Sequence, residues 1–337
     1  MAYVLDEQVI NWLLEPDESM PSIRYLTLKN ITHTDGSELK KTSSETTLSG
    51  LIPAILEHQH PGGYWESPDS IYLPKYTATI WQVILLAQMG AGREHPLISK
   101  ACEYLLGNSM TDFGGFSITG RQSGCANCLQ GNACAALLTL GYGDDERLQK
   151  AVDWMARSAT GDGFSYDRKS SPGSFYLRSG ISGPGFLCSA NDHQPCAWGA
   201  VKIAMALGKT TKANRSPAIK KAILACREFL LSADPAGANY PHPYAKKPSQ
   251  SWFRFGFPVF YVTDVLQNIE ALLGLGLSGD PRLKNAIDLL ESKRDDHGRW
   301  KMAYSYNGKM WVDIEERGKT SKWVTYRALK VLIDYYQ

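Results

Sequence analysis

The sequence predicts an all-α protein built as an (α/α)6-type toroid of five to six helix-pair repeats, in one domain spanning residues 1–337. Three observations predict it. Amphipathic helical segments alternate with more apolar ones along the chain. Short turns rich in glycine and aromatic residues join the two segments of each pair. The pairs recur with a period of roughly 50 to 60 residues, which is typical of repeat architectures.

One repeat unit reads as an amphipathic helix, a glycine and aromatic turn, and an apolar helix that ends in glycine. The expected first helices lie at 49–65, 95–109, 144–158, 216–232 and 280–294, and the second helices at 75–92, 128–143, 193–208, 260–276 and 320–337. The segment 6–32 supplies one more helix pair. Side-chain oxygens suit the starts of first helices and glycines suit helix ends. The expected caps are Asp144, Ser216 and Asp280, and the expected C-terminal glycines are Gly92, Gly143, Gly208 and Gly276.

Neither kind of helix buries its apolar surface alone, so the repeats must stack. A closed ring with amphipathic helices outside and apolar helices inside buries both sets. An open solenoid is the structural alternative, and it requires polar caps at both ends. The last helix, 320–337, is as apolar as the expected inner helices. This favours a closed ring.

Composition excludes several classes of function. The net charge is +2 and the sequence holds no basic cluster interleaved with aromatic residues, which argues against nucleic-acid binding. No apolar run approaches the roughly 20 residues of a membrane span. The N-terminal segment carries acidic residues and lacks a basic region, so we expect no signal peptide and a cytoplasmic protein. In a reducing compartment, the seven cysteines should be buried thiols, metal ligands or reactive groups.

Two cysteine-containing segments predict a metal site. The first is GCANCLQGNAC and the second is CSANDHQPC. Both lead into expected inner helices of consecutive repeats, which places them at one mouth of the ring. Thiolates and imidazole at this spacing suit Zn²⁺. The candidate ligands are Cys125, Cys128, Cys188, His193 and Cys196.

Five candidates exceed the usual four zinc ligands. We favour the last four of them, with Cys125 as a substitute or near neighbour. The alternative is that all these cysteines are packing residues. Cys134 lies further along its helix and is expected in the core, and Cys102 and Cys226 are expected as small buried groups of outer helices. A closed four-ligand zinc site would be structural, whereas an open three-ligand site would be catalytic.

The remaining starts of inner helices contribute many aromatic residues to the same mouth. The candidate substrate-binding residues are Trp81, Tyr240, Trp252, Arg254, Phe257 and Trp323. A cavity wall of aromatic side chains suits an apolar or cationic ligand. The alternative is that these rings fill the centre of the toroid. The loop 171–185 either covers the mouth or forms a surface excursion.

The candidate catalytic residues are Asp264, His193 and Tyr261. Asp264 lies near the start of an apolar inner helix, where burial would raise its pKa and let it act as an acid. The alternative is a structural ion pair with Arg254 or Lys322, which we favour.

The turns HPGGYWES, DFGGFS, GDGFSYD and DDHGRW resemble degenerate forms of the Q-x-x-x-G-x-W repeat of the terpenoid cyclase and protein prenyltransferase superfamily. This squalene-cyclase-like resemblance covers nearly the whole chain and implies the toroid and an apolar cavity. The D-x-D-D acid motif of squalene–hopene-type cyclases and the D-D-x-x-D motif of class I terpene synthases are both missing. Protein prenyltransferases hold zinc with an Asp, a Cys and a His, which is not the thiol-rich pattern found here.

These observations predict a zinc-dependent enzyme, either a lyase, isomerase, hydrolase or transferase, that acts on a hydrophobic substrate such as an isoprenoid in an aromatic-lined cavity. Zinc would polarise the substrate or activate a water or thiol. One alternative is a ligand-binding or scaffold protein in which zinc is structural. A further alternative is a relative of the prenyltransferase β-subunit that works with a partner chain.

Overall fold

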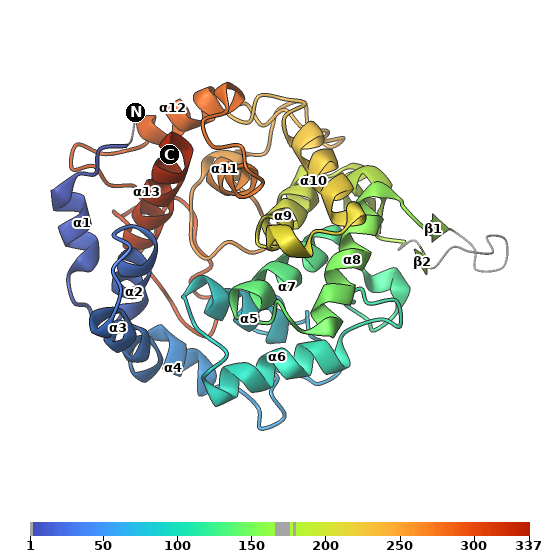
Figure 1. Ribbon diagram of the computed structural model, residues 1–337, viewed down its shortest axis with the longest axis horizontal. Coiled ribbons are helices and arrows are strands. Elements are labelled where there is room, and N and C mark those ends of the chain that lie inside the picture. The colour runs from blue at the N-terminus through green and yellow to red at the C-terminus, as the bar shows by residue number, and fades with distance from the viewer. Residues whose placement is uncertain (1–2, 166–175, 178–179) are drawn as a thin grey trace.

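The computed structural model describes residues 3–165, 176–177 and 180–337, and the described chain is mostly helical (Figure 1). The helices are α1 (Glu7–Leu14), α2 (Pro21–Asn30), α3 (Ser37–Leu48), α4 (Leu51–Leu56), α5 (Thr79–Gln88), α6 (Pro96–Asn108), α7 (Asn127–Thr139), α8 (Glu146–Thr160), α9 (Ala197–Gly208), α10 (Pro217–Leu230), α11 (Val265–Gly274), α12 (Lys284–Ser292) and α13 (Lys322–Tyr336). Part of the predicted mouth loop, 171–175 and 178–179, lies outside the described residues.

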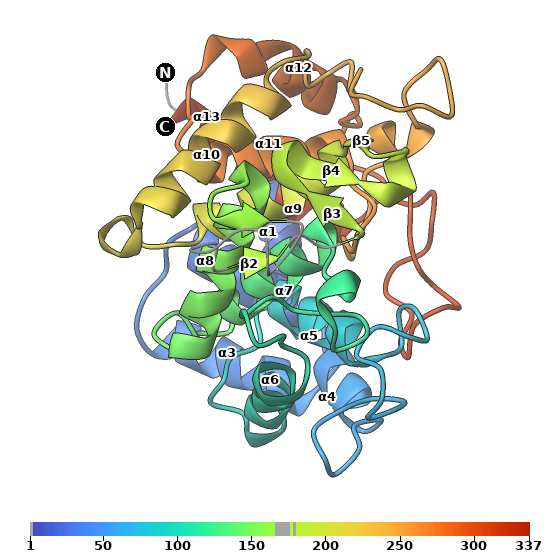
Figure 2. The ribbon, with the colours of Figure 1, turned by 90° about the vertical axis from the view of Figure 1, so that its right-hand side faces the viewer.

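Short strands occupy the segment between α8 and α9. β1 (Phe164–Ser165) pairs in parallel with β2 (Tyr176–Leu177). β3 (Ser182–Gly183), β4 (Leu187–Cys188) and β5 (Gln194–Pro195) form an antiparallel sheet in the order β3-β4-β5. Because β5 ends directly before α9, this small sheet lies at the start of that helix (Figure 2).

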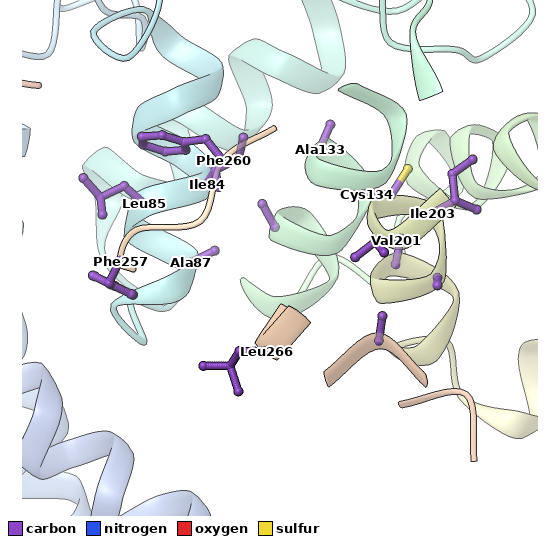
Figure 3. Close-up of a cluster of buried hydrophobic side chains, with 14 of the residues drawn as sticks. Ile84, Leu85, Ala87, Ala133, Cys134, Val201, Ile203, Phe257, Phe260 and Leu266 are labelled. Atoms are coloured by element: carbon purple, nitrogen blue, oxygen red, sulfur yellow. The ribbon is translucent and has the colours of Figure 1, made fainter. Parts of the chain in front are cut away.

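The helices form two sets that differ in burial. Nearly every residue of α5 and α9 is buried, whereas α6, α10 and α12 bury one side. Along the inner set, α5 packs on α7, α7 on α9, α9 on α11 and α11 on α13, and α13 also contacts α2. Figure 3 shows side chains of α5, α7 and α9 meeting Phe257, Phe260 and Leu266 in one core. Cys134 lies in this core, and Cys102 and Cys226 are also fully buried.

Two of the glycine and aromatic turns hold their helix pairs together through matching contacts. The buried indole of Trp65 donates to the Ile55 carbonyl at 2.9 Å, and that of Trp300 donates to the Leu290 carbonyl at 2.8 Å. The backbone N–H of each tryptophan donates to a threonine hydroxyl of the inner helix, Thr79 and Thr325, both at 3.0 Å. The turn therefore ties the end of the first helix to the start of the second.

The turn glycines also pack against the next outer helix. Gly63, Gly114 and Gly298 have positive φ angles of 92°, 98° and 76°, which favour glycine. A Cβ on them would lie 2.7 Å from the Lys100 carbonyl oxygen of α6, 2.8 Å from Lys150 Cγ of α8 and 2.8 Å from Val9 Cγ2 of α1. The turn of the last pair thus packs against the first helix of the chain.

Several local expectations need correction. The predicted pairs omitted α3, because Ser37–Leu48 is polar and fully buries only Thr42 and Thr46, which leaves no apolar stripe to detect. The helix expected within 49–65 has only six residues, α4. The cap of α8 is Asp145 rather than Asp144. The positive φ angles after α5 and α7 fall at Gly90 and Gly141, two residues before Gly92 and Gly143. In contrast, Ser216 caps α10 and Asp280 caps the turn before α12 as expected.

None of the helices in the described part of the chain combines the length and hydropathy that a membrane span requires.

The closest approach of two inner helices is between α7 and α9. A Cβ at Gly131 of α7 would lie 2.2 Å from the backbone carbonyl carbon of Lys202 in α9, and one at Gly199 would lie 3.0 Å from Asn127 Cβ. A side chain at Gly131 would therefore collide with backbone, which cannot move aside without displacing the helix.

We expect Gly131→Ala to lower the free energy of unfolding by about 1–3 kcal/mol, because the added methyl overpacks the α7–α9 contact. Gly107→Ala is the matched control, since a Cβ there meets nothing within 4 Å in helix α6. The control should be stabilised by up to about 1 kcal/mol through helix propensity. Urea denaturation measures both changes, and equal effects of the two substitutions would contradict the packing argument.

Candidate functional site

A cavity of about 230 Å³ opens beside the starts of α7 and α9. Its other walls come from the β3–β5 sheet, the segment 238–252 and Tyr261. The lining residues are Ala126, Asn127, Cys128, Ser182, Cys188, Ala190, Asn191, Cys196, Ala197, Trp198, Gly199, Ala238, Tyr240, Pro241, His242, Tyr244, Pro248, Ser249, Trp252 and Tyr261. The described lining thus combines aromatic rings, apolar carbon and thiols with a few uncharged polar groups and one histidine.

Three thiols lie on the cavity wall. Cys128 is the second residue of α7, Cys188 belongs to β4, and Cys196 directly precedes α9. The Cys196 thiol hydrogen-bonds the Cys188 sulfur and, with the backbone amides of residues 190 and 191, lowers the pKa of Cys188 to about 6 despite burial. The same contact and burial raise the pKa of Cys196. The lowered pKa of Cys188 and the raised pKa of Cys196 favour a thiolate on Cys188 and a thiol on Cys196.

The third thiol, Cys128, has a raised pKa, in contrast to Cys188. Burial raises the pKa of Cys128 to about 11, and the nearby charge of Cys188 acts in the same direction. Cys128 therefore stays protonated beside the thiolate at neutral pH. The close contact between α7 and α9 brings Cys128 to the same cavity as Cys196. The two cysteine-containing segments therefore meet although they are about 60 residues apart in the sequence.

The small sheet connects these segments by hydrogen bonds. The Asn127 backbone N–H donates to the Ser182 hydroxyl at 2.9 Å, and Ser182 pairs with Cys188 in the sheet. The backbone N–H of Cys196 donates to the Phe186 carbonyl at 2.9 Å. The positions of all three thiols therefore depend on backbone geometry rather than on flexible side chains.

The other two predicted ligands, Cys125 and His193, do not line the cavity. Cys125 is buried, and its sulfur lies near Gly115 and the Trp154 ring rather than on the cavity wall. His193 is exposed and has a positive φ of 54°, although its charge still reaches Cys188. Across the described ranges, no three or more His, Cys, Asp or Glu side chains form a group that could hold a metal ion. Zinc binding stays a prediction.

The aromatic wall contains three of the predicted residues, Tyr240, Trp252 and Tyr261. The rings of Tyr240 and Trp252 have centroids 5.4 Å apart. The Tyr240 hydroxyl donates to the Leu230 carbonyl at 2.7 Å and accepts from the Asn268 side chain at 2.9 Å, which fixes this ring. The wall therefore includes at least one rigid, pre-oriented aromatic surface.

Trp198 also lines the cavity although it was not among the predicted residues, and its ring lies 6.3 Å from that of Tyr261. Trp198 is the second residue of α9 and shares the cavity with Cys196. The sequence held a signal for Trp198, because this residue lies at the start of an expected inner helix. The other candidate residues at the mouth were selected for the same reason.

The remaining predicted substrate-binding residues lie away from this cavity. The Trp81 indole is buried and donates to the Tyr72 carbonyl at 2.8 Å. Phe257 stacks on Trp323 in the core, with ring centroids 3.8 Å apart. Arg254 lines a separate space of only about 20 Å³. Trp81, Phe257 and Trp323 are all buried in the core. Their position fits the alternative interpretation, in which these rings fill the centre.

Asp264 lines the same small space and takes part in helix capping and ion pairing. Its carboxylate accepts from the Gln267 backbone N–H at 2.7 Å at the start of α11. Its ion-pair partner is Arg327 of α13, at 3.7 Å, instead of the expected Arg254 or Lys322. Lys322 faces Glu15 at 3.6 Å. Burial nevertheless raises the pKa of Asp264, with Arg327 acting in the opposite direction.

A buried lysine was also missed. Lys202 of α9 is fully buried, and its ammonium nitrogen contacts the Gln267 side-chain oxygen and lies 3.4 Å from the Val262 carbonyl. Burial lowers its pKa to about 7. The available signal was a single lysine within the apolar run AWGAVKIAMALG.

Comparison with known proteins supports the fold class. No protein-family model and no curated protein matches the sequence. Among solved structures, the chain is similar to a glycosyl hydrolase of family 88 from Bacteroides vulgatus, with a TM-score of 0.50 and 11% identity over 98% of this chain and 97% of the other. It is also similar to a protein from Actinoplanes (TM-score 0.44, 13% identity, 98% and 97% coverage).

A third similar structure is the type II terpene cyclase MstE from Scytonema with geranylgeranyl dihydroxybenzoate, with a TM-score of 0.35 and 15% identity over 88% of this chain and 97% of the other. The similarity to this cyclase covers most of the chain, at low identity. At 11% identity, the match to the family 88 glycosyl hydrolase supports a similar, mostly helical fold and leaves the activity open.

We expect iodoacetamide to alkylate Cys188 with a rate that is half-maximal near pH 6, because the thiolate is the reacting form. Peptide mass spectrometry after timed labelling measures the rate at each pH. Cys196→Ala, which removes the hydrogen bond to the Cys188 sulfur, should move the midpoint to higher pH. A wild-type midpoint near the ordinary thiol value of about 8.5 would contradict the assigned interaction.

Proposed function

We propose that the protein is an enzyme, a hydrolase or transferase, that acts on an uncharged apolar small molecule held in this cavity, with Cys188 as the nucleophile. The observation that carries the proposal is the presence of Cys188 and two further thiols in the lining of a cavity that is rich in aromatic and aliphatic groups and whose described lining holds no Lys, Arg, Asp or Glu. We also propose that the repeats close into an (α/α)6-type toroid, with the cavity at one mouth.

Contacts between the two ends of the chain support closure of the ring. The Asn30 side chain at the end of α2 donates to the Tyr326 hydroxyl of α13 at 2.7 Å. The Arg299 guanidinium lies 4.1 Å from the centroid of the Trp12 ring. The packing of Gly298 against α1 repeats the contact that other turns make with the next outer helix. The first and last pairs thus meet as consecutive pairs do.

The charge of the wall supports an uncharged ligand. The described residues that line the cavity include no Lys, Arg, Asp or Glu. Cys188 adds a negative charge at neutral pH. A phosphate or carboxylate placed there would lose hydration without gaining an opposite charge, which is costly in a partly buried site. The aromatic and aliphatic residues favour a hydrocarbon-rich ligand instead.

The chemistry of the thiols supports a covalent mechanism. A thiolate at neutral pH is a strong nucleophile, and it would attack an electrophilic carbon such as an ester carbonyl to form a covalent intermediate. The Cys196 thiol beside it can return a proton to a leaving alcohol. Release of the acyl group to water or to a second alcohol then completes a hydrolase or transferase cycle.

Zinc is a second candidate for the role of the thiols, because three cysteines form a soft donor set. The described residues do not fit a ready metal site, since no group of three or more potential ligands among them has a suitable arrangement. Binding would need Cys128, Cys188 and Cys196 to move toward a common point. We therefore keep zinc as a proposal and assign no reaction step to it.

Ligand binding is tested with farnesol and farnesyl phosphate by isothermal titration calorimetry. We expect the alcohol to bind at least about tenfold more tightly than the phosphate, which corresponds to about 1.4 kcal/mol. Trp252→Ala should weaken farnesol binding at least about tenfold, as expected for an aromatic anchor. Trp311→Ala is the control, because Trp311 stacks on His58 and does not line the cavity. Tighter binding of the phosphate would contradict the charge argument.

Catalysis is tested with p-nitrophenyl octanoate as an apolar ester. We expect the wild-type protein to release p-nitrophenol and to accumulate an acyl group on Cys188 that mass spectrometry detects. Cys188→Ala should lose at least about a hundredfold in rate while keeping its affinity for farnesol. Cys226→Ala is the control because Cys226 is buried in α10. Equal rates for wild type and Cys188→Ala would contradict the nucleophile assignment and leave a ligand-binding protein.

The zinc proposal has its own measurement. If zinc binds, protein purified without chelators should contain about one zinc per chain by elemental analysis, and cobalt exchange should give thiolate-to-cobalt charge-transfer bands. Cys128→Ser and Cys196→Ser should each reduce the metal content. Metal-free protein that does not take up cobalt would contradict the proposal.

A further inference from the structure

The register of the β4–β5 hairpin places two cysteines on the same face. Cys188 lies opposite Gln194, and Leu187 lies opposite Pro195. The Cys196 backbone N–H donates to the Phe186 carbonyl at 2.9 Å, so the pairing continues for one more position. Side chains alternate between the two faces of a strand. Cys188 and Cys196 are therefore diagonal neighbours on one face, and both line the cavity.

The spacing of this pair suits a reversible bond. Diagonal neighbours across an antiparallel pair lie about 7–8 Å apart at Cα, and disulfides span about 4.4–6.8 Å. A tightening of the hairpin by about 1 Å would therefore bring the two sulfurs to bonding distance. Such a bond would carry some strain, which makes it easier to reduce than a structural disulfide.

The connection between the two cysteines is a short, well-defined turn. It contains a 3-10 helix, Ser189–Asn191, followed by Asp192 and His193 with positive φ angles of 52° and 54°. The Asn191 side chain donates to the Pro195 carbonyl at 3.0 Å and to the Pro241 carbonyl at 3.1 Å. The turn holds the two strands in register, so little chain entropy is lost when they are cross-linked.

Cys128 is a less suitable partner for either cysteine. It belongs to α7, whose position is fixed by the backbone contact at Gly131. A bond to Cys128 would have to pull a packed helix, whereas a bond between Cys188 and Cys196 only tightens a hairpin. Cys125 is excluded as a partner by its position beside Trp154, away from the cavity.

We propose that Cys188 and Cys196 are a site of reversible oxidation that closes to an intramolecular disulfide. With a hydroperoxide as the oxidant, the Cys188 sulfur attacks the peroxide oxygen, the O–O bond breaks, and an alcohol or water leaves as Cys188 becomes a sulfenic acid. The Cys196 sulfur then attacks the Cys188 sulfur, the S–O bond breaks, and water leaves with the Cys196 proton. The two cysteines lose two electrons and the hydroperoxide gains them.

Formation of this disulfide would change the chemical groups that line the cavity. A disulfide removes the Cys188 nucleophile and the adjacent thiol, and it links β4 to the residue that precedes α9. The oxidised cavity would still hold an apolar ligand but would keep only the Cys128 thiol. The pairing itself rests on the hairpin geometry and not on the proposed reaction, so each can fail without the other.

The test treats the full-length protein with a small excess of hydrogen peroxide, without added metal and after dialysis against a chelator. Peptide mass spectrometry under non-reducing conditions then locates disulfides, and dimedone labels sulfenic acid. We expect a Cys188–Cys196 disulfide that dithiothreitol reverses. We also expect it to form at least about tenfold faster than Cys102 or Cys226 is oxidised, since buried structural cysteines are inert.

Single variants separate the two steps. Cys196→Ser should accumulate the dimedone adduct at Cys188 and form no disulfide there, and Cys128→Ser should form the Cys188–Cys196 disulfide as wild type does. Circular dichroism and urea denaturation check that each variant is folded. A persistent sulfenic acid in wild type, a Cys128–Cys188 disulfide, or oxidation no faster than at Cys102 would overturn the proposal. If the disulfide forms while ester hydrolysis is absent, only the proposed function fails.

Discussion

The close contact between α7 and α9 determines the position of the candidate site. Two glycines, Gly131 and Gly199, remove the side chains that would otherwise separate these helices. As a result the first residues of both helices face the same cavity, and Cys128 and Cys196 line it together. The site therefore depends on backbone packing that is set by the absence of side chains.

A second constraint lies among the inner helices α9, α11 and α13. Arg327 makes paired hydrogen bonds of 2.9 and 2.8 Å with Glu270 and donates to the Gly256 carbonyl at 2.7 Å. Asp264 and Lys202 complete this buried group of charges. Because unpaired buried charges are costly, the group fixes the relative position of three helices.

Most of the helical repeat could be predicted from the sequence, because amphipathic and apolar segments alternate strongly. α3 could not, since Ser37–Leu48 has no apolar stripe. The meeting of Cys128, Cys188 and Cys196 followed from placing consecutive inner helices side by side. The positions of Cys125 and His193 did not follow, because spacing along the chain does not determine which face of a short loop a side chain occupies. The partner of Asp264 was missed because Arg327 lies in the middle of α13, on a face that the sequence pattern alone does not define.

The packing of the last turn against the first helix affects how the protein unfolds. In linear repeat arrays, terminal repeats have a neighbour on one side only and fray first. Here Tyr3 stacks on Tyr336, with ring centroids 5.9 Å apart, and the two ends of the chain lie together (Figure 1). Each end repeat therefore has a neighbour on both sides, and loss of any one pair exposes two others. Unfolding of this chain should be a single cooperative event, in which no terminal repeat separates while the cavity stays intact.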